Sequence, residues 1–370
     1  MSVIKVLIVD DSLIFRHAVA DALKTEPDIK IAGSVRNGLK AVEFIREHDV
    51  DIVTLDLEMP EMDGLETIDE IQKLNKSRSN THKIGIVMLS ALTIAGARST
   101  IQALEKGAFD FITKPQNSSD DDCIQLLNRE LVPRIRQYMR TGSSPVHRKT
   151  LAMAGLASVK AAAVTAKSAI AFRNRSEIKA ILIGVSTGGP RALSDMLPDL
   201  CLKTTLPVLI VQHMPPDFTR SLAENLDKKC SHHVTEATDG ERILNNTIYI
   251  APGGRHMMIA TNDSGEEVIA INDQPPENGC RPSVDILFRS AAAVYGCNAL
   301  PILLTGMGTD GTLGIRPLKR AGAWIIAQDE ASSVVWGMPG SAVDTGLVDE
   351  IVPLQKIPDA IFAATNKQDA

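Results

Sequence analysis

Aromatic residues are scarce in this sequence, at 4% of 370 positions, so its cores must be built from aliphatic side chains. No apolar run approaches the roughly 20 residues that a membrane-spanning helix needs, which argues against membrane insertion. The first ten residues lack the basic-then-apolar pattern of a secretion signal. The five cysteines include no C-x-x-C pair, and their odd number excludes complete disulfide pairing. These absences predict a cytoplasmic protein with reduced, buried thiols.

An excess of basic residues is also missing, because the formal net charge is −6. Of the segments 1–140, 141–176 and 177–370, only 141–176 has more Lys and Arg than Asp and Glu; it contains no acidic residue at all, and both flanking segments are acidic. This distribution argues against nucleic acid as a main partner and therefore against a DNA-acting regulator. With 44% hydrophobic residues, the chain can bury substantial cores.

Residues 141–176 have the composition of a linker. The segment opens with Thr141-Gly142-Ser143-Ser144-Pro145 and continues as Ala-rich sequence with few large apolar side chains. Such a segment cannot build a core of its own, although residues 151–171 suit a transient helix because Ala is the best helix former. We therefore predict domains at residues 1–140 and 177–370, joined by a basic, Ala-rich linker at 141–176.

Short apolar runs alternate with helical patterns in both predicted domains, which is typical of parallel sheets covered on both faces. The N-terminal domain has five such runs, at 5–9, 29–34, 52–55, 84–89 and 109–113. The C-terminal domain has buried runs at 180–183, 208–211, 299–304 and 324–327. Between residues 234 and 272 short runs broken by Asp-Gly and Gly-Gly predict hairpins. The predicted fold class is α/β, with two doubly wound parallel-sheet domains and a β-hairpin insert in the second.

Acidic residues follow two of the N-terminal strands. Asp10 and Asp11 lie just past the first strand, and Asp56 ends the third. The functional groups of a doubly wound sheet gather at the carboxyl ends of its strands, so three carboxylates should converge. Their mutual repulsion would be relieved by a hard divalent cation such as Mg²⁺. Ser90 and Lys114, at the ends of the fourth and fifth strands, would complete a site for a phosphoryl group on Asp56. Singly, each residue is also a common turn or helix-cap residue.

This region resembles the response-regulator receiver domain over about its full length. The matching residues are Asp10-Asp11, Asp56, Met59-Pro60, Asp63-Gly64, Ser90-Ala91 and Lys114-Pro115. The resemblance implies that Asp56 accepts phosphate from a histidine kinase. It also implies Mg²⁺ binding by Asp10, Asp11, Asp56 and the backbone carbonyl of Glu58. Phe111 matches the aromatic position that such domains reorient on activation, and ordinary packing explains this residue equally well.

The C-terminal domain opens with a strand that runs into a glycine-rich turn containing Gly184-x-Ser186-x-Gly188. This is the G-x-S-x-G spacing of a nucleophile elbow, where small neighbours allow the serine backbone to turn sharply. Pro190 then suits the first turn of a helix, whose N-terminus favours developing negative charge. A phosphate-binding turn is the alternative interpretation of this motif.

A nucleophilic serine needs a base, and His213 ends an apolar strand where it would face Ser186; His256 is the competing candidate. Asp310, after another strand, would orient the histidine and stabilise its charged form. Backbone N–H groups near Met307 or Thr187 would form the oxyanion hole. Residues 306–311 also form a G-x-G-x-x-G run with Asp329 further on, so a dinucleotide site is a rival interpretation. The order Ser, His, Asp departs from the Ser, Asp, His order of ordinary α/β-hydrolases.

Residues 180–353 resemble the catalytic domain of the chemotaxis protein-glutamate methylesterases, the CheB family. The matching runs are at 183–190, 211–216, 250–256, 281–285, 305–311 and 337–340. The resemblance implies Ser186 as nucleophile, His213 as base, Asp310 as orienting residue and the Met307 N–H as an oxyanion donor, with no cofactor for the esterase reaction. It further implies hydrolysis of glutamyl methyl esters on chemoreceptors, deamidation of glutamines, and control by phosphorylation of a receiver that covers the active site. A receiver-controlled, non-catalytic module that binds phosphate or a nucleotide remains the alternative.

Overall fold

The protein is described by a computed structural model that covers residues 3–78, 83–115, 120–142 and 177–366. The chain divides into two compact units, Met1–His147 and Arg148–Ala370, and each is described by itself. Most of the predicted linker, including the proposed helix at 151–171, lies outside the described residues. Within those residues, no helix combines the length and the apolar character that crossing a bilayer demands.

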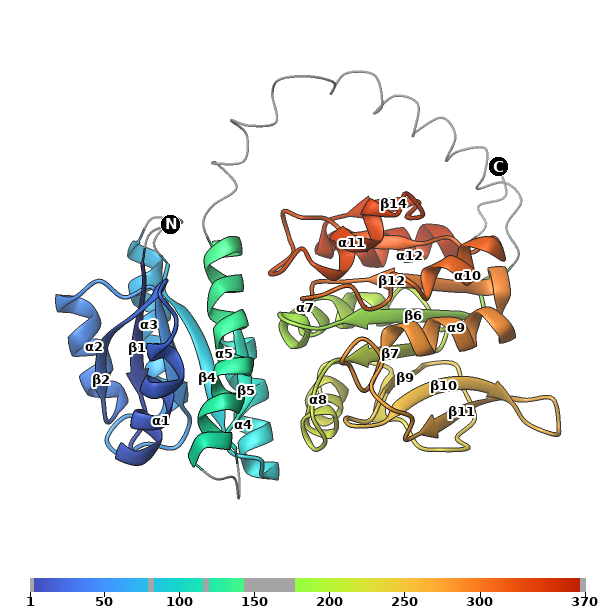
Figure 1. The fold of residues 1–370 in the computed structure, drawn as a ribbon. Helices are drawn as coiled ribbons and strands as arrows, with labels where there is room; N and C mark the ends of the chain where they lie inside the picture. The colour runs from blue at the N-terminus through green and yellow to red at the C-terminus, as the bar shows by residue number, and fades with distance from the viewer. Residues whose placement is uncertain (1–2, 79–82, 116–119, 143–176, 367–370) are drawn as a thin grey trace. The chain divides into compact units, whose positions relative to one another are not determined.

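The first unit is the parallel five-stranded sheet that the sequence predicts, and its strand order is β2-β1-β3-β4-β5. Helices α1 and α5 pack against each other, and α2, α3 and α4 form a second packed series. The strands are β1 (Ile4–Val9), β2 (Ile29–Val35), β3 (Ile52–Asp56), β4 (Gly85–Ser90) and β5 (Asp110–Thr113). The helices are α1 (Leu13–Lys24), α2 (Gly38–Glu47), α3 (Gly64–Ser77), α4 (Ile94–Glu105) and α5 (Asp120–Gly142) (Figure 1).

The direction of chain winding reverses between β1 and β3, and this is where a doubly wound sheet of this order leaves a crevice. Strands β1, β3 and β4 are almost entirely buried, which explains their continuous apolar character. Local capping fixes where the helices begin. For example, the Asp63 side chain accepts from the Glu66 N–H while the Glu66 carboxylate accepts from the Asp63 N–H, forming a capping box at the start of α3.

The second unit has a seven-stranded parallel sheet in the order β14-β13-β12-β6-β7-β9-β8. Its strands are β6 (Ala180–Val185), β7 (Val208–Gln212), β8 (His233–Glu236), β9 (Thr247–Ile250), β12 (Ala299–Leu303), β13 (Ile326–Gln328) and β14 (Glu350–Val352). Its helices are α7 (Gly189–Cys201), α8 (Phe218–Asp227), α9 (Val284–Val294), α10 (Ile315–Arg320), α11 (Met338–Asp344) and α12 (Ile357–Thr365), with short 3₁₀ turns at η2 (Gly296–Asn298) and η3 (Leu354–Lys356).

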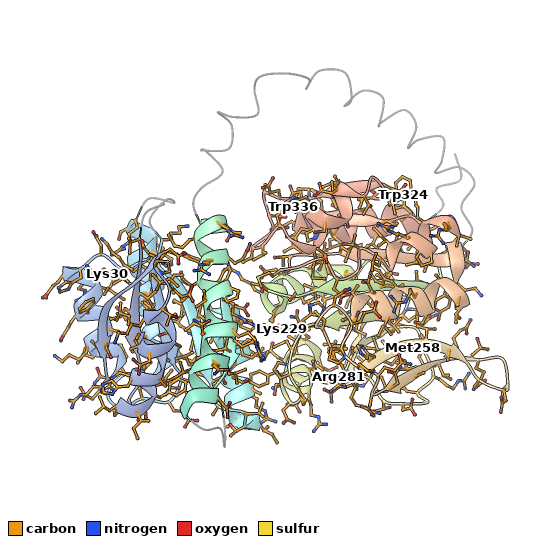
Figure 2. The ribbon with its side chains drawn as sticks, viewed as in Figure 1. Lys30, Lys229, Met258, Arg281, Trp324 and Trp336 are labelled. Carbon is orange, nitrogen blue, oxygen red and sulfur yellow. The ribbon has the colours of Figure 1, made fainter. Side chains whose placement is uncertain are left out.

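The hairpin prediction for residues 234–272 is confirmed in part. Strands β10 (His256–Thr261) and β11 (Glu267–Asn272) form an antiparallel hairpin that packs on α9, the hairpin visible in Figure 1. Strands β8 and β9 instead join the main sheet as parallel neighbours, so the prediction is wrong for them. Strand β14 was not predicted, and Trp324, labelled in Figure 2, precedes β13 rather than belonging to it.

One hydrophobic core cluster of the second unit lies between the sheet, α9 and the hairpin. It is largely aliphatic, as the scarcity of aromatic residues requires, with Tyr249 and Phe288 as its largest fully buried side chains. The winding direction reverses between β6 and β12. The carboxyl ends of β12, β6 and β7 therefore lie side by side, and they carry the predicted Asp310, Ser186 and His213 respectively.

Candidate active site and phosphoacceptor site

Ser186 lies in a sharp turn between β6 and α7. Its N–H donates to the Thr305 carbonyl at 3.0 Å, and its own carbonyl accepts from the Gly189 N–H at 2.8 Å and from the Gln212 Nε2 at 3.0 Å. Gly188 adopts φ +79°, a conformation that favours glycine. A Cβ there would lie 2.7 Å from the Val334 Cβ, so both the turn and its close packing require glycine. The backbone thus holds a half-buried serine in a fixed position at the carboxyl end of β6.

Asp310 is buried, with 2% of its surface exposed, and is the most heavily hydrogen-bonded carboxylate of this site. Its Oδ2 accepts from the His213 Nε2 at 2.8 Å and from the Val284 N–H at 2.7 Å. Its Oδ1 accepts from the Ser283 hydroxyl and from the N–H groups of Asp285 and Gly311, at 2.9, 3.0 and 3.0 Å. Since Val284 and Asp285 open α9, the carboxylate also lies at a helix N-terminus, which stabilises its negative charge.

The electrostatics of the pair follow from burial and from these bonds. Burial alone would raise the pKa of Asp310, but the hydrogen bond from His213 and those from the Val284 and Asp285 N–H groups outweigh it and lower that pKa. Burial likewise would lower the pKa of His213, but Asp310 and then Cys280 outweigh it and raise that pKa to about 9. Asp310 therefore orients the ring and stabilises its imidazolium form.

Ser186 and His213 are neighbours across the ends of β6 and β7. The last paired positions are Val185 and Gln212, and the His213 N–H donates to the Val185 carbonyl at 3.2 Å. Among the described residues, however, the Ser186 hydroxyl makes no hydrogen bond to the imidazole. The ring nitrogen that Asp310 leaves available, Nδ1, faces the Cys280 Sγ at 3.7 Å. A nucleophile–base contact between these two side chains would require a local side-chain rotation.

The two predicted oxyanion donors lie beside Ser186. Gly306 packs so closely that a Cβ on it would lie 2.9 Å from the Ser186 Cβ. The next residue, Met307, is exposed, and its N–H has no hydrogen-bond partner within the described ranges. Thr187 is buried, and its carbonyl accepts from the Thr305 hydroxyl at 2.9 Å. The Met307 N–H is therefore available to donate to a developing oxyanion.

The competing sequence candidates have structural roles. His256 is fully buried in β10; one ring nitrogen lies 3.2 Å from the Pro275 carbonyl, and the other accepts from the Ser283 N–H at 3.2 Å. Asp329 accepts from the N–H and the hydroxyl of Ser332, closing a local turn. The acidic residue within the glycine run, Asp310, is committed to His213 and α9. These contacts disfavour a dinucleotide site at residues 306–311.

The N-terminal carboxylates converge as predicted. Ligand oxygens of Asp10, Asp11 and Asp56 all lie within 4.8 Å of one another, and the Lys114 Nζ lies 2.7 Å from both Asp10 Oδ2 and Asp56 Oδ2. Burial raises the pKa of Asp56 to about 6, opposed by Lys114 and reinforced by Asp10. Burial would lower the pKa of Lys114, but Asp56 and Asp10 outweigh it and raise it. Three close carboxylate oxygens form the donor set that Mg²⁺ prefers, so the residues present fit this cation.

The remaining receiver residues are positioned around this cluster. Ser90 ends β4, and its buried hydroxyl accepts from the Thr100 hydroxyl at 2.7 Å. Phe111 is buried in β5, with 7% of its surface exposed. Glu58 follows β3 by two residues with an exposed side chain, and the role of its carbonyl as a ligand stays a prediction.

Sequence reasoning missed Cys280 and the side chains that hold Asp310. Four of the five cysteines are partly exposed, so the prediction of buried thiols is wrong except for Cys201. Cys280 comes to the site from the loop between β11 and α9, where its neighbour Arg281 is labelled in Figure 2. The run Arg281–Asp285 was singled out only as part of a resemblance, and no spacing rule connects it to His213.

Comparison with known proteins defines the class. Residues 6–123 match the family described as response regulator receiver domain, and residues 181–361 match the family described as CheB methylesterase. The chain is 43% identical over 366 residues to a protein-glutamate methylesterase/protein-glutamine glutaminase of Desulfotalea psychrophila, covering 98% of each chain. It is 40% identical to a protein of the same name from Nocardioides, covering 99% of this chain and 96% of that one. The solved CheB methylesterase catalytic domain of Thermotoga maritima is 39% identical, covers 50% of this chain and 98% of that one, and gives a TM-score of 0.49.

The chain is thus a receiver domain followed by a methylesterase-type α/β domain. It belongs to the protein-glutamate methylesterase/protein-glutamine glutaminase family, and the resemblance noted from its sequence is confirmed.

Proposed function

We propose that this protein is a serine esterase that hydrolyses glutamyl methyl esters on the cytoplasmic helices of chemoreceptors and deamidates receptor glutamines, under the control of Asp56 phosphorylation. The single observation that carries the proposal is the 2.8 Å contact between His213 Nε2 and the buried Asp310, at the strand end next to Ser186. A binding module for phosphate or a nucleotide would leave this imidazole–carboxylate pair without a task.

The proposed reaction uses the ring nitrogen opposite Asp310. The His213 Nδ1 accepts the proton of the Ser186 hydroxyl as its oxygen attacks the ester carbonyl, while Asp310 stabilises the imidazolium. The Met307 N–H donates to the resulting oxyanion, a contact typically worth about 10²–10³ in rate. The imidazolium then gives its proton to the departing methoxide, so methanol leaves, and water releases the free glutamate in a second step with His213 again as base. Attack on a glutamine amide follows the same course and releases ammonia.

The receiver unit supplies the control in this proposal. A histidine kinase would be the phosphodonor, and Asp56 would attack its phosphoryl group through a carboxylate oxygen. Asp10, Asp11 and Asp56 would hold Mg²⁺, with the Glu58 carbonyl as a further ligand; when bound, the cation neutralises charge on the phosphoryl oxygens. Lys114 already contacts Asp56 Oδ2 and would transfer that contact to a phosphoryl oxygen. The Ser90 hydroxyl and Phe111 would then respond to the new group, and the esterase would become more active.

The proposal is tested with receptor-containing membranes carrying labelled methyl esters. The wild-type chain should release labelled methanol, and more of it when a small acyl phosphate donor and Mg²⁺ are added. Ser186→Ala should abolish release while the protein keeps its melting temperature, and Ser194→Ala, on the adjacent helix α7, is the matched control. Undiminished methanol release by Ser186→Ala would reject Ser186 as the nucleophile, whereas no methanol release by the wild-type chain would reject the esterase and favour the binding module.

A further inference from the structure

Cys280 lies against the His213 ring nitrogen that the proposed reaction needs, and the esterase mechanism gives this thiol no role. Ligand atoms of Cys280, His213 and Asp310 all lie within 4.8 Å of one another. From this arrangement we propose that Cys280 Sγ and His213 Nδ1 form a binding site for Zn²⁺, and that zinc bound there inhibits the enzyme reversibly.

The spacing of the two donors fits one ion. Zinc binds thiolate sulfur at about 2.3 Å and imidazole nitrogen at about 2.0–2.1 Å with tetrahedral angles, which places sulfur and nitrogen roughly 3.6 Å apart. The separation between Cys280 Sγ and His213 Nδ1 is 3.7 Å. An ion can therefore enter between them without a backbone movement.

The histidine is already oriented for a metal. A metal-ligating histidine usually donates its second ring N–H to a carboxylate, which fixes the tautomer and raises the basicity of the ligating nitrogen. Asp310 accepts in this way from the His213 Nε2 at 2.8 Å and is itself held by α9. The same carboxylate that prepares Nδ1 to accept a proton thus prepares it to accept a metal ion.

The cysteine is also held in place. Backbone hydrogen bonds link Glu277 and Cys280 in both directions, at 3.1 and 2.8 Å, and close a tight turn. This turn is anchored on α9, because the Arg289 guanidinium pairs with Glu277 at 2.5 and 2.6 Å and the Asn278 Nδ2 donates to Asp285 Oδ2 at 3.0 Å. The thiol therefore occupies a built position rather than the tip of a loose loop.

The donor types select the ion. A thiolate and an imidazole favour Zn²⁺ and other soft or borderline ions, whereas the carboxylate oxygens of the receiver favour Mg²⁺. Both Cys280 and His213 are partly exposed, so the ion has access from solvent, and water molecules would complete its coordination. Binding releases the thiol proton to solvent. An occupied Nδ1 cannot accept the Ser186 proton, so methanol release stops until the ion leaves.

The experiment uses the full chain under a non-thiol reductant. Zinc should inhibit methanol release by the wild-type protein, and a chelator should restore it. The rate of each variant, Cys280→Ser and Cys280→Ala, is compared with its own zinc-free rate. The zinc concentration for half inhibition should increase about tenfold or more, because losing even a residue that only hydrogen-bonds to a metal ligand lowers metal affinity by about that factor. Cys297→Ser is the matched control and should behave like the wild type. Cys297 is also partly exposed, but it lies just before the amino end of β12, away from the carboxyl strand ends that carry the site.

A second readout does not depend on activity. Co²⁺ bound by Cys280 should give a thiolate-to-cobalt charge-transfer band in the wild type and in Ser186→Ala, and Zn²⁺ should displace it. Failure of the esterase proposal would remove methanol release but leave this band, so the two proposals fail separately. Equal zinc inhibition of the wild type and both Cys280 variants, or a cobalt complex without a Cys280-dependent band, would overturn the zinc site.

Discussion

Replacement of Asp310 by asparagine should inactivate the esterase by reversing the tautomer of His213. Oδ1 of Asp310 accepts three hydrogen bonds and Oδ2 accepts two, so the single oxygen of an asparagine amide should take the Oδ1 position. Its NH₂ group then faces His213 Nε2, which must become an acceptor. The ring proton moves to Nδ1, and the nitrogen needed to deprotonate Ser186 is no longer a base.

The expected magnitude is large for the rate and moderate for stability. A wrong tautomer in a serine triad lowers kcat by about 10⁴-fold, which corresponds to about 5 kcal/mol in the activation barrier. The NH₂ group also meets the Val284 N–H, and an unsatisfied buried donor costs about 1–3 kcal/mol of folding stability. Loss of the charge at the start of α9 adds about 0.3–1 kcal/mol.

The assay compares kcat for methanol release with the melting temperature of Asp310→Asn. Asp329→Asn is the matched control, because Asp329 also follows a strand of the same sheet but its side chain, among the described residues, accepts hydrogen bonds only from the nearby Ser332. The control should keep kcat within a small factor. A loss below about tenfold in Asp310→Asn, with the fold intact, would refute the assignment of Asp310 as the orienting residue.

Three further predictions concern the switch, the base and the elbow. Asp56→Asn should keep a low methanol release that a phosphodonor does not increase, whereas the surface variant Asp69→Asn on α3 should respond normally; stimulation of Asp56→Asn to the wild-type level would contradict the phosphoacceptor role. Because Asp310 and Cys280 raise the pKa of His213 to about 9, kcat/KM should increase with pH up to that value, and a plateau reached by pH 7 would be inconsistent with it. The same shift stabilises the fold below the ordinary pKa of 6.5, and this contribution is lost as pH rises through 9. Gly188→Ala should cost about 1–3 kcal/mol, since φ is +79° and Val334 blocks the added Cβ; an unchanged melting temperature would argue against this strain.

The sequence was sufficient to predict the two sheets where strands are buried on both faces. The apolar runs of β6 and β7 have no competing interpretation, because their residues are completely buried. It was insufficient for β8 and β9, where four-residue strands beside glycine turns resemble a hairpin until pairing partners are known. Strand β14 alternates exposed and partly buried residues over three positions and carries too weak a pattern.

The candidate site shows the same division. Ser186, His213 and Asp310 were accessible to prediction because strand ends of a doubly wound sheet meet at one edge. The contact between Cys280 and His213 was not, because it depends on a turn anchored by Glu277 and Arg289, a tertiary arrangement without local sequence signal. Which ring nitrogen faces Asp310 likewise depends on the side-chain rotation and not on residue identity.

The carboxylate of Asp310 performs two jobs with the same atoms. Oδ2 accepts from the His213 ring and from the Val284 N–H, and Oδ1 accepts from the Ser283 hydroxyl and from the Asp285 N–H. Val284 and Asp285 lie in the first turn of α9. In the proposed mechanism, fold stability and turnover are therefore coupled at this position, because the same two oxygens serve both. A relative that had lost esterase activity would still need this aspartate for its fold. An aspartate at this position is therefore weak evidence that a relative is an active esterase.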